Sequence, residues 1–248
     1  MSAVTGSSSD VPVEAPRSIP RRIGHALGSF LVLAGVVMLA WAGLIYFWQD
    51  PVTAVYAKYE QHRLASSYRA LASDYKPVVL PQAPHAERQG LAVEARRYRL
   101  DATQGQAIGR IMVPRLGLSM VMVNGTDEST LKRGPGRDLR TFMPGEGQLV
   151  YVAGHRTTYL APFSHIDSLR PGDLVTLRVP YGDFIYRVRF HRIVVASDLA
   201  VLQSHGKEVV VLQACHPRFF ASHRYLVYAY PVRVIPRNGR PYDLPNAQ

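Results

Sequence analysis

The feature that most constrains this 248-residue chain is an uncharged run of 23 residues, Ala26–Trp48, near its N-terminus. As a helix rising about 1.5 Å per residue, this run covers roughly 34 Å, enough for a bilayer core of about 30 Å. Arg21 and Arg22 precede the run and Asp50 follows it. Positive charge favours the cytoplasmic side, so we expect a single-pass anchor in the cell membrane with an extracellular remainder. A cleaved signal peptide is the alternative, but its apolar region is usually only about 7–15 residues long.

Around this anchor the sequence predicts five segments. Leu64, Tyr68, Leu71 and Tyr75 recur at helical spacing, which favours a stalk helix that continues out of the membrane. Three prolines between Pro77 and Gly90 are typical of a spacer. The predicted organisation is therefore a disordered cytoplasmic tail at 1–22, an anchor at 23–49, a helical stalk and Pro-rich linker at 50–104, a β-domain at 105–234, and a loose tail at 235–248.

From residue 105 onward the pattern changes to short apolar strands separated by turns such as Asn124-Gly125 and Pro144-Gly145. Seven or eight strands with little helix predict an all-β fold, either a closed barrel or a sandwich, around one core. Short helices are expected at Asp127–Leu131 and Ala161–Leu169. The candidate strands are Ile108–Val113, Leu118–Val123, Gln148–Ala153, Leu174–Val179, Phe184–Val195, Val209–Cys215 and Tyr225–Val234.

Charge and cysteine content narrow the classes of partner. A formal net charge of +11 suits an anionic surface, and the anchor favours acidic lipid and wall polymer over nucleic acid. The single cysteine excludes an internal disulfide framework and a multi-cysteine zinc site. An exported protein with one thiol leaves it buried, pairs it with another chain, or uses it.

That cysteine, Cys215, ends the apolar run Val209–Cys215, and a second run begins at Arg224 after eight residues that include Pro217. Two such runs with a breaker between them predict two strands and a loop. If the strands pair antiparallel about 4.8 Å apart, the thiol and the guanidinium can face the same site. Cys215 and Arg224 are therefore our first candidates for function.

A thiol with a pKa near 8.5 is a weak nucleophile until a partner activates it. Among the nine histidines, His155 directly follows a predicted strand, whereas His165 falls in a predicted helix. Together the three groups suit acyl transfer: Cys215 attacks a carbonyl, His155 protonates the leaving amine, and Arg224 holds the oxyanion. A hydrolytic cysteine peptidase and a non-catalytic surface β-domain that binds wall polymer remain alternatives. A metal site from Cys215, His155 and a second histidine has weak support, and we predict no metal and no cofactor.

Residues 105–234 resemble the sortases, cysteine transpeptidases that attach surface proteins to the bacterial cell wall, and are most similar to class E. The stretches that carry the resemblance are AIGRIMVPRLGL (Ala107–Leu118), NGTDESTLKRGPG (Asn124–Gly136), AGHRTTYLAPFSHIDSLRPGDLVTL (Ala153–Leu177) and LQACHPRFFASHRYLVYA (Leu212–Ala229).

The resemblance implies an eight-stranded sortase β-barrel in which Cys215, His155 and Arg224 take the catalytic places. It also implies substrate binding by Tyr159, Thr157 and Thr158. The expected reaction cuts a sorting signal, L-A-x-T-G or L-P-x-T-G, between Thr and Gly through a thioester. The implied partners are surface proteins that carry this signal, an amine acceptor such as a peptidoglycan precursor, and membrane lipid around residues 26–48.

The sequence departs from the family pattern at two places. Gln213-Ala214 precede Cys215 where the family has threonines, so a hydroxyl contact to substrate is absent there. Leu160 follows Tyr159 where the family has glycine, which narrows the expected pocket. Both departures bear on the signal that is recognised and leave the chemistry unchanged.

Overall fold

The computed structural model of the chain describes residues 19–47, 51–78 and 84–244, and the chain divides into two compact units after Phe47. The first unit contains helix α1 (Ile19–Phe47). Its segment Ile23–Gly43 is the one helix in the described residues that is long and apolar enough to cross a membrane. The predicted anchor therefore forms a helix, which begins within the predicted tail of residues 1–22. Residues 1–18 and 48–50 lie outside the described part of the chain.

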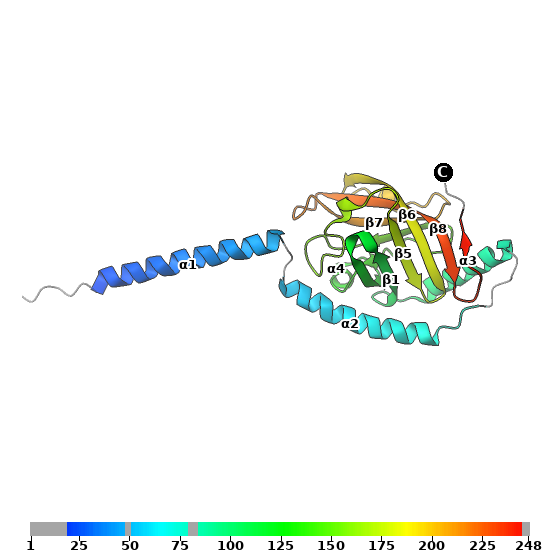
Figure 1. The fold of residues 1–248 in the computed structure, drawn as a ribbon, viewed down its shortest axis with the longest axis horizontal. Helices are drawn as coiled ribbons and strands as arrows, with labels where there is room; N and C mark the ends of the chain where they lie inside the picture. The colour runs from blue at the N-terminus through cyan, green and yellow to red at the C-terminus, as the bar shows by residue number, and fades with distance from the viewer. Residues whose placement is uncertain (1–18, 48–50, 79–83, 245–248) are drawn as a thin grey trace, which may run out of the picture. The chain divides into compact units, whose positions relative to one another are not determined.

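The second unit is built on a closed antiparallel and parallel β-barrel, as predicted (Figure 1). Its eight strands follow one another in the order β6-β5-β1-β2-β3-β4-β7-β8, and β8 pairs back with β6 to close the ring. The strands are β1 (Ala107–Val113), β2 (Leu118–Asn124), β3 (Gly136–Arg137), β4 (Leu149–Ala153), β5 (Leu174–Val179), β6 (Gly182–Val195), β7 (Val209–His216) and β8 (His223–Pro236).

The barrel closes around side chains that alternate along its strands. In β5, Val175, Leu177 and Val179 are buried, whereas the alternate residues Leu174 and Arg178 are exposed and Thr176 is half-buried. This period of two is what a strand with one face towards the core produces. The same core contains Ile111 of β1, Phe184 of β6 and Leu212 of β7, each fully buried.

Two helices pack on the barrel within residues 50–104, the region for which the sequence predicts a helical stalk and a Pro-rich linker. Helix α2 (Pro51–Asp74) lies along β1 and β2 and buries Leu64 and Tyr68 against them (Figure 1). The Gln61 side chain donates to the Val121 carbonyl at 3.0 Å and accepts from the Val121 amide at 2.8 Å, so it satisfies an open strand edge. The apolar face predicted from spacing is real, but it faces the barrel.

Helix α3 (Pro84–Asp101) also belongs to the barrel, because Leu91, Ala95 and Tyr98 lie in the main core. The Tyr98 hydroxyl donates to the Ile108 carbonyl at 2.9 Å. The predicted spacer therefore ends by residue 84, and residues 79–83 within it lie outside the described residues.

Three smaller elements complete the comparison with the sequence. Asp127 caps α4 (Glu128–Leu131), which confirms the first predicted short helix. The second, Ala161–Leu169, is wrong: only a 3-10 turn, η2 (Ile166–Ser168), forms there, and another 3-10 turn, η1 (Pro114–Leu116), follows β1. The predicted loose tail contains β9 (Tyr242–Asp243), which pairs with Arg233 and Val234 of β8, while residues 245–248 lie outside the described part.

Candidate active site

Three neighbouring strands place the predicted catalytic residues at one end of the barrel. Cys215 of β7 is paired directly with Arg224 of β8 in the antiparallel ladder, as the sequence predicted. Strand β4 runs parallel to β7 with Ala153 opposite Gln213. His155 lies two residues beyond Ala153, as Cys215 lies two residues beyond Gln213. The two residues therefore lie at the same level along the two strands.

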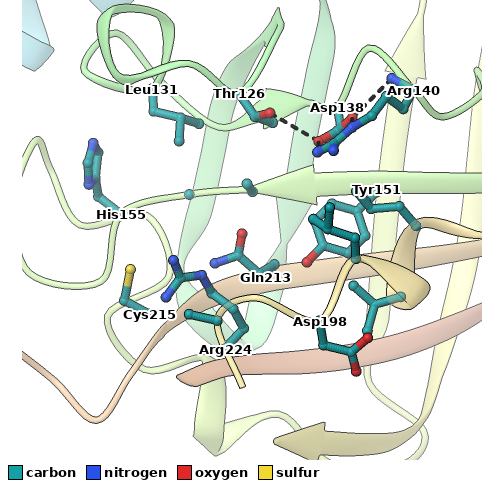
Figure 2. Close-up of a pocket in the computed structure, with 16 residues that line it drawn as sticks. Thr126, Leu131, Asp138, Arg140, Tyr151, His155, Asp198, Gln213, Cys215 and Arg224 are labelled. Atoms are coloured by element: carbon teal, nitrogen blue, oxygen red, sulfur yellow. Dashed lines mark hydrogen bonds and ion pairs between the residues drawn. The ribbon is translucent and has the colours of Figure 1, made fainter. Parts of the chain in front are cut away.

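These residues share a cavity of about 250 Å³ on the outer side of the barrel wall. Cys215 and Arg224 lie side by side in it, and His155 lies opposite them (Figure 2). One wall is the 3-10 turn η3 (Leu199–Leu202), which follows β6, and another is formed by Leu131 of α4. The structure thus brings together the three groups that the sequence proposed for acyl transfer.

His155 has the surroundings of a proton-transfer group. Its Nε2 is buried and makes no hydrogen bond with the described residues. Burial lowers its pKa below the ordinary value of 6.5, the Lys132 ammonium lowers it further, and the Glu128 carboxylate acts in the opposite direction. Lys132 and Glu128 pair with each other at 2.7 Å, so their fields on the imidazole partly cancel. The ring is therefore biased towards its neutral form.

Arg224 is held by its own loop. Its Nη1 donates to the carbonyl oxygens of Ala221, at 2.7 Å, and His223, at 3.0 Å. The guanidinium of an arginine carries five N–H donors, so two bonds from one nitrogen leave the other side of the fork available for an oxyanion. The figure shows this group beside the thiol of Cys215, where an oxyanion would form (Figure 2).

Arg156, which the sequence analysis did not single out, connects the histidine segment to the cysteine strand. Its side chain is only 4% exposed and forms an ion pair with Asp167 at 3.0 Å. Its Nη1 donates to the Cys215 carbonyl at 3.2 Å and lies 3.0 Å from Nδ1 of His216. Because Arg156 directly follows His155, its buried guanidinium links the segment that carries His155 to the strand that carries Cys215. The sequence shows that Arg156 stands next to His155, but it does not show that the side chain of an arginine in a loop is buried.

The predicted substrate-binding residues occupy the loop beyond His155, and the cavity wall does not include Thr157, Thr158 or Tyr159. The Tyr159 ring instead lies 5.1 Å from the His155 ring and 6.1 Å from the ring of Tyr56 on α2. Its amide donates to Oγ1 of Thr53 at 3.0 Å. Tyr159 is therefore placed to support the His155 ring from outside the cavity wall.

The backbone of this loop is strained at Leu160, where the family has glycine. Its φ of 63° lies in the left-handed region, which costs an L-residue about 1–2 kcal/mol. The glycine before the histidine, Gly154, is needed for space, because a Cβ there would lie 2.7 Å from the Phe163 ring. The loop thus combines one enforced small residue, Gly154, with a run of three left-handed residues, Tyr159, Leu160 and Ala161.

The far end of the cavity holds polar groups that the sequence did not identify. Asp138 accepts hydrogen bonds from Thr126 at 3.1 Å and from Arg140 at 2.9 and 2.7 Å (Figure 2). Burial alone would raise the pKa of Asp138, but the bonds from Arg140 outweigh it and hold the pKa below its usual value. Among the described residues, no group of three or more His, Cys, Asp or Glu side chains is placed to hold a metal ion.

Comparison with known proteins identifies a Sortase domain at residues 111–232. Sortase D of Bacillus subtilis is 31% identical over 128 residues, which are 50% of this chain and 63% of that protein. Sortase SrtE1 of Streptomyces coelicolor is 24% identical over 234 residues, which are 88% of this chain and 60% of that protein. The chain thus spans less than two thirds of the length of the curated relatives it matches.

Solved structures show the same fold. The crystal structure of Sortase E1 from Streptomyces coelicolor, with a tripeptide in its active site, aligns with a TM-score of 0.51 at 25% identity over 54% of this chain and 92% of that one. A Clostridium perfringens Sortase D5 transpeptidase aligns with a TM-score of 0.56 at 21% identity over 70% of this chain and 98% of that one. The second likeness is evidence for the barrel alone.

Proposed function

We propose that this chain, whose residues 111–232 match the Sortase domain, is a membrane-anchored cysteine transpeptidase with Cys215, His155 and Arg224 as its catalytic residues. The observation that carries the proposal is the strand arrangement: Cys215 and Arg224 are cross-strand partners on β7 and β8, and His155 follows β4, the parallel neighbour of β7. All three line one cavity.

In the first half-reaction, Sγ of Cys215 attacks the carbonyl carbon of the threonine in a sorting signal. The negative charge that develops on the carbonyl oxygen is held by the Arg224 guanidinium, whose planar fork of N–H donors suits an oxyanion. His155 takes the proton of the Cys215 thiol as Sγ attacks, and gives it to the leaving amine when the bond between threonine and glycine breaks. The product is a thioester between Cys215 and the surface protein.

In the second half-reaction, an amine attacks the thioester carbonyl and His155 takes the proton from it. The carbon–sulfur bond breaks, the thiolate returns, and a new amide joins the surface protein to the acceptor. His155 then returns this proton to the Cys215 thiolate. The lowered pKa of His155 supports its role as the base, because it keeps the ring neutral and therefore able to accept a proton from the attacking amine. Water in place of the amine would give hydrolysis.

The substrate class follows from the family resemblance: surface proteins with an L-A-x-T-G or L-P-x-T-G signal, joined to a cell-wall amine. Tyr159 beside His155 supports the class E preference for L-A-x-T-G. Helix α1 supports a single-pass anchor, and the arginines before its apolar segment support a cytoplasmic N-terminus and an extracellular barrel.

The test is incubation of the full-length protein in detergent with matched L-A-x-T-G and L-P-x-T-G peptides, with and without an amine acceptor. Mass spectrometry should find cleavage between threonine and glycine, an acyl adduct on Cys215, and an amide product that requires the acceptor. Cleavage that ignores the acceptor would replace the transpeptidase with a hydrolytic peptidase. Absence of both cleavage and adduct would favour a non-catalytic surface domain.

A further inference from the structure

A second hollow lies on the same outer face of the barrel as the catalytic cavity. It has a volume of about 420 Å³ and is bordered by Val209 of β7, Phe190 of β6, and Tyr228 and Tyr230 of β8. We call it the distal hollow. Asp198 and the η3 residue Val201 line both this hollow and the catalytic cavity, so the 3-10 turn η3 separates two adjoining depressions.

The register of β7 fixes how far apart the two depressions lie. Side chains alternate along a strand, so Val209, Val211, Gln213 and Cys215 share the outer face while Val210, Leu212 and Ala214 face the barrel core. Val209 is six residues before Cys215, which at about 3.3 Å per residue is roughly 20 Å. An extended peptide of about six residues therefore spans from the thiol to the distal hollow.

The catalytic cavity also indicates the direction in which a bound peptide runs. Gln213 and Cys215 line it from β7, and no described residue beyond Cys215 on that strand does so. Its apolar wall lies on the other side, at Leu199, Val201 and Leu202, next to the distal hollow. An acyl chain attached to Cys215 thus has room to run back along β7 towards η3. A four-residue signal ends before the hollow, which is reached by the residues that precede the signal.

The chemistry of the distal hollow selects a class of peptide. The rings of Phe190 and Tyr228 stack with centroids 4.6 Å apart, and the Phe190 side chain is 41% exposed, so an aromatic platform is open to a ligand. Arg192, Lys207 and His205 surround this platform, and Asp198 is the one acidic residue among the described residues that line the hollow. A net positive border attracts carboxylates, and the flat rings pack against peptide groups.

We propose that the distal hollow is a specificity site for the segment of the surface protein that immediately precedes the sorting signal, and that it favours acidic residues there. This inference rests on the proposed transpeptidase function and extends it, because it predicts that recognition goes beyond the signal itself. Exposed ion pairs are individually weak, so two or three of them change the specificity constant by about tenfold at low salt.

The experiment compares three peptides with one signal and different six-residue N-terminal extensions: Asp/Glu-rich, Asn/Gln-rich and Lys-rich. With the full-length protein in detergent, we expect kcat/KM to be about tenfold higher for the acidic than for the basic extension, and the ratio to shrink at about 0.5 M salt. The ratio should approach one in Lys207→Glu. It should persist in the matched control Lys76→Glu, which makes the same charge change at an exposed position outside both depressions.

Other outcomes overturn the inference. A wild-type ratio near one, or a ratio that Lys207→Glu leaves unchanged, means that the hollow does not contact the extension. If Lys207→Glu instead changes the ratio of amide product to hydrolysis product equally for all peptides, the distal hollow binds the amine acceptor. A peptide without any extension reports on the proposed function separately. If the enzyme cleaves no peptide, anisotropy of labelled peptides on Cys215→Ala still measures the charge preference, and equal affinities would reject it.

Discussion

The two faces of strand β7 differ in what they do, although their residues alternate along the same eight positions. Val210, Leu212 and Ala214 face inward and are fully buried in the barrel core. Gln213 and Cys215 face outward and line the catalytic cavity. The inner face thus supplies stability, and the outer face carries the cysteine that we propose as the nucleophile. The difference shows that a rigid site can be built on the outside of a barrel whose interior is filled with side chains.

The largest effect on function is expected from Cys215→Ala on the outer face. We expect transpeptidation to fall by at least about 10⁴-fold, because no other group can form the thioester. The variant should keep the melting temperature of the wild type within a few degrees, since a half-buried side chain loses only its sulfur. Product formation by mass spectrometry and a thermal melt measure both. Appreciable turnover in this variant would remove the covalent mechanism.

The inner face is tested by Leu212→Ala. Deleting a fully buried leucine leaves a cavity and lowers the free energy of unfolding by about 2–5 kcal/mol. Its outer neighbour Gln213→Ala should lower it by less than about 1 kcal/mol. Urea unfolding followed by circular dichroism gives both values. Equal losses for the two variants would show that the faces are not divided in this way.

Arg156 sharpens the comparison because its guanidinium contacts the segment that carries Cys215, although Arg156 does not line the cavity. In Arg156→Gln we expect kcat to fall by about 10- to 100-fold with a smaller change in KM, since the Cys215 carbonyl loses its donor and the loop after His155 loses its anchor. Alkylation of Cys215 by a thiol reagent should change in rate and in pH dependence. Arg156→Lys should restore part of kcat, and Asp167→Asn is the matched control on the exposed partner. A loss confined to stability would make Arg156 a structural residue only.

The smallest expected effect is electrostatic. Lys132 lowers the pKa of His155, so Lys132→Gln should raise that pKa towards or above its ordinary value. The variant also leaves the Glu128 carboxylate unpaired near the imidazole, where it stabilises the protonated form. Both effects therefore raise the pKa of His155. NMR titration of the His155 ring measures the shift directly, and Lys76→Gln controls for loss of one charge. An unchanged pKa would mean that burial alone sets it.

Much of this architecture could be predicted because strand periodicity and breakers are local signals. The pairing of Cys215 with Arg224 follows from two apolar runs and the short connection between them, and the structure has that register. The parallel pairing of β4 with β7 could not be predicted, because those strands are separated by β5 and β6 and no local pattern records which edge they share. His155 was therefore selected for its place after a strand, without evidence that this strand lay beside the cysteine.

The errors have a related physical cause. The apolar face of α2 was visible in the spacing of Leu64 and Tyr68, but amphipathicity does not specify the partner, and a helix after a membrane segment suggests a stalk. The segment 161–169 contains apolar residues at helical spacing, yet the left-handed φ of Ala161 and the packing of Phe163 into the core stop a helix from forming. Arg156 and the polar group around Asp138 depend on contacts between distant segments.

The placement of the trio on three adjacent strands has a consequence for quality control. Side chains along a strand alternate between its two faces. A slip of one position between β4, β7 and β8 would therefore turn one of the three residues towards the core or separate it from the other two. A copy with incorrect pairing would lack the arrangement of Cys215, His155 and Arg224 on which the proposed reaction depends. Correct pairing of these three strands is thus itself a condition for activity.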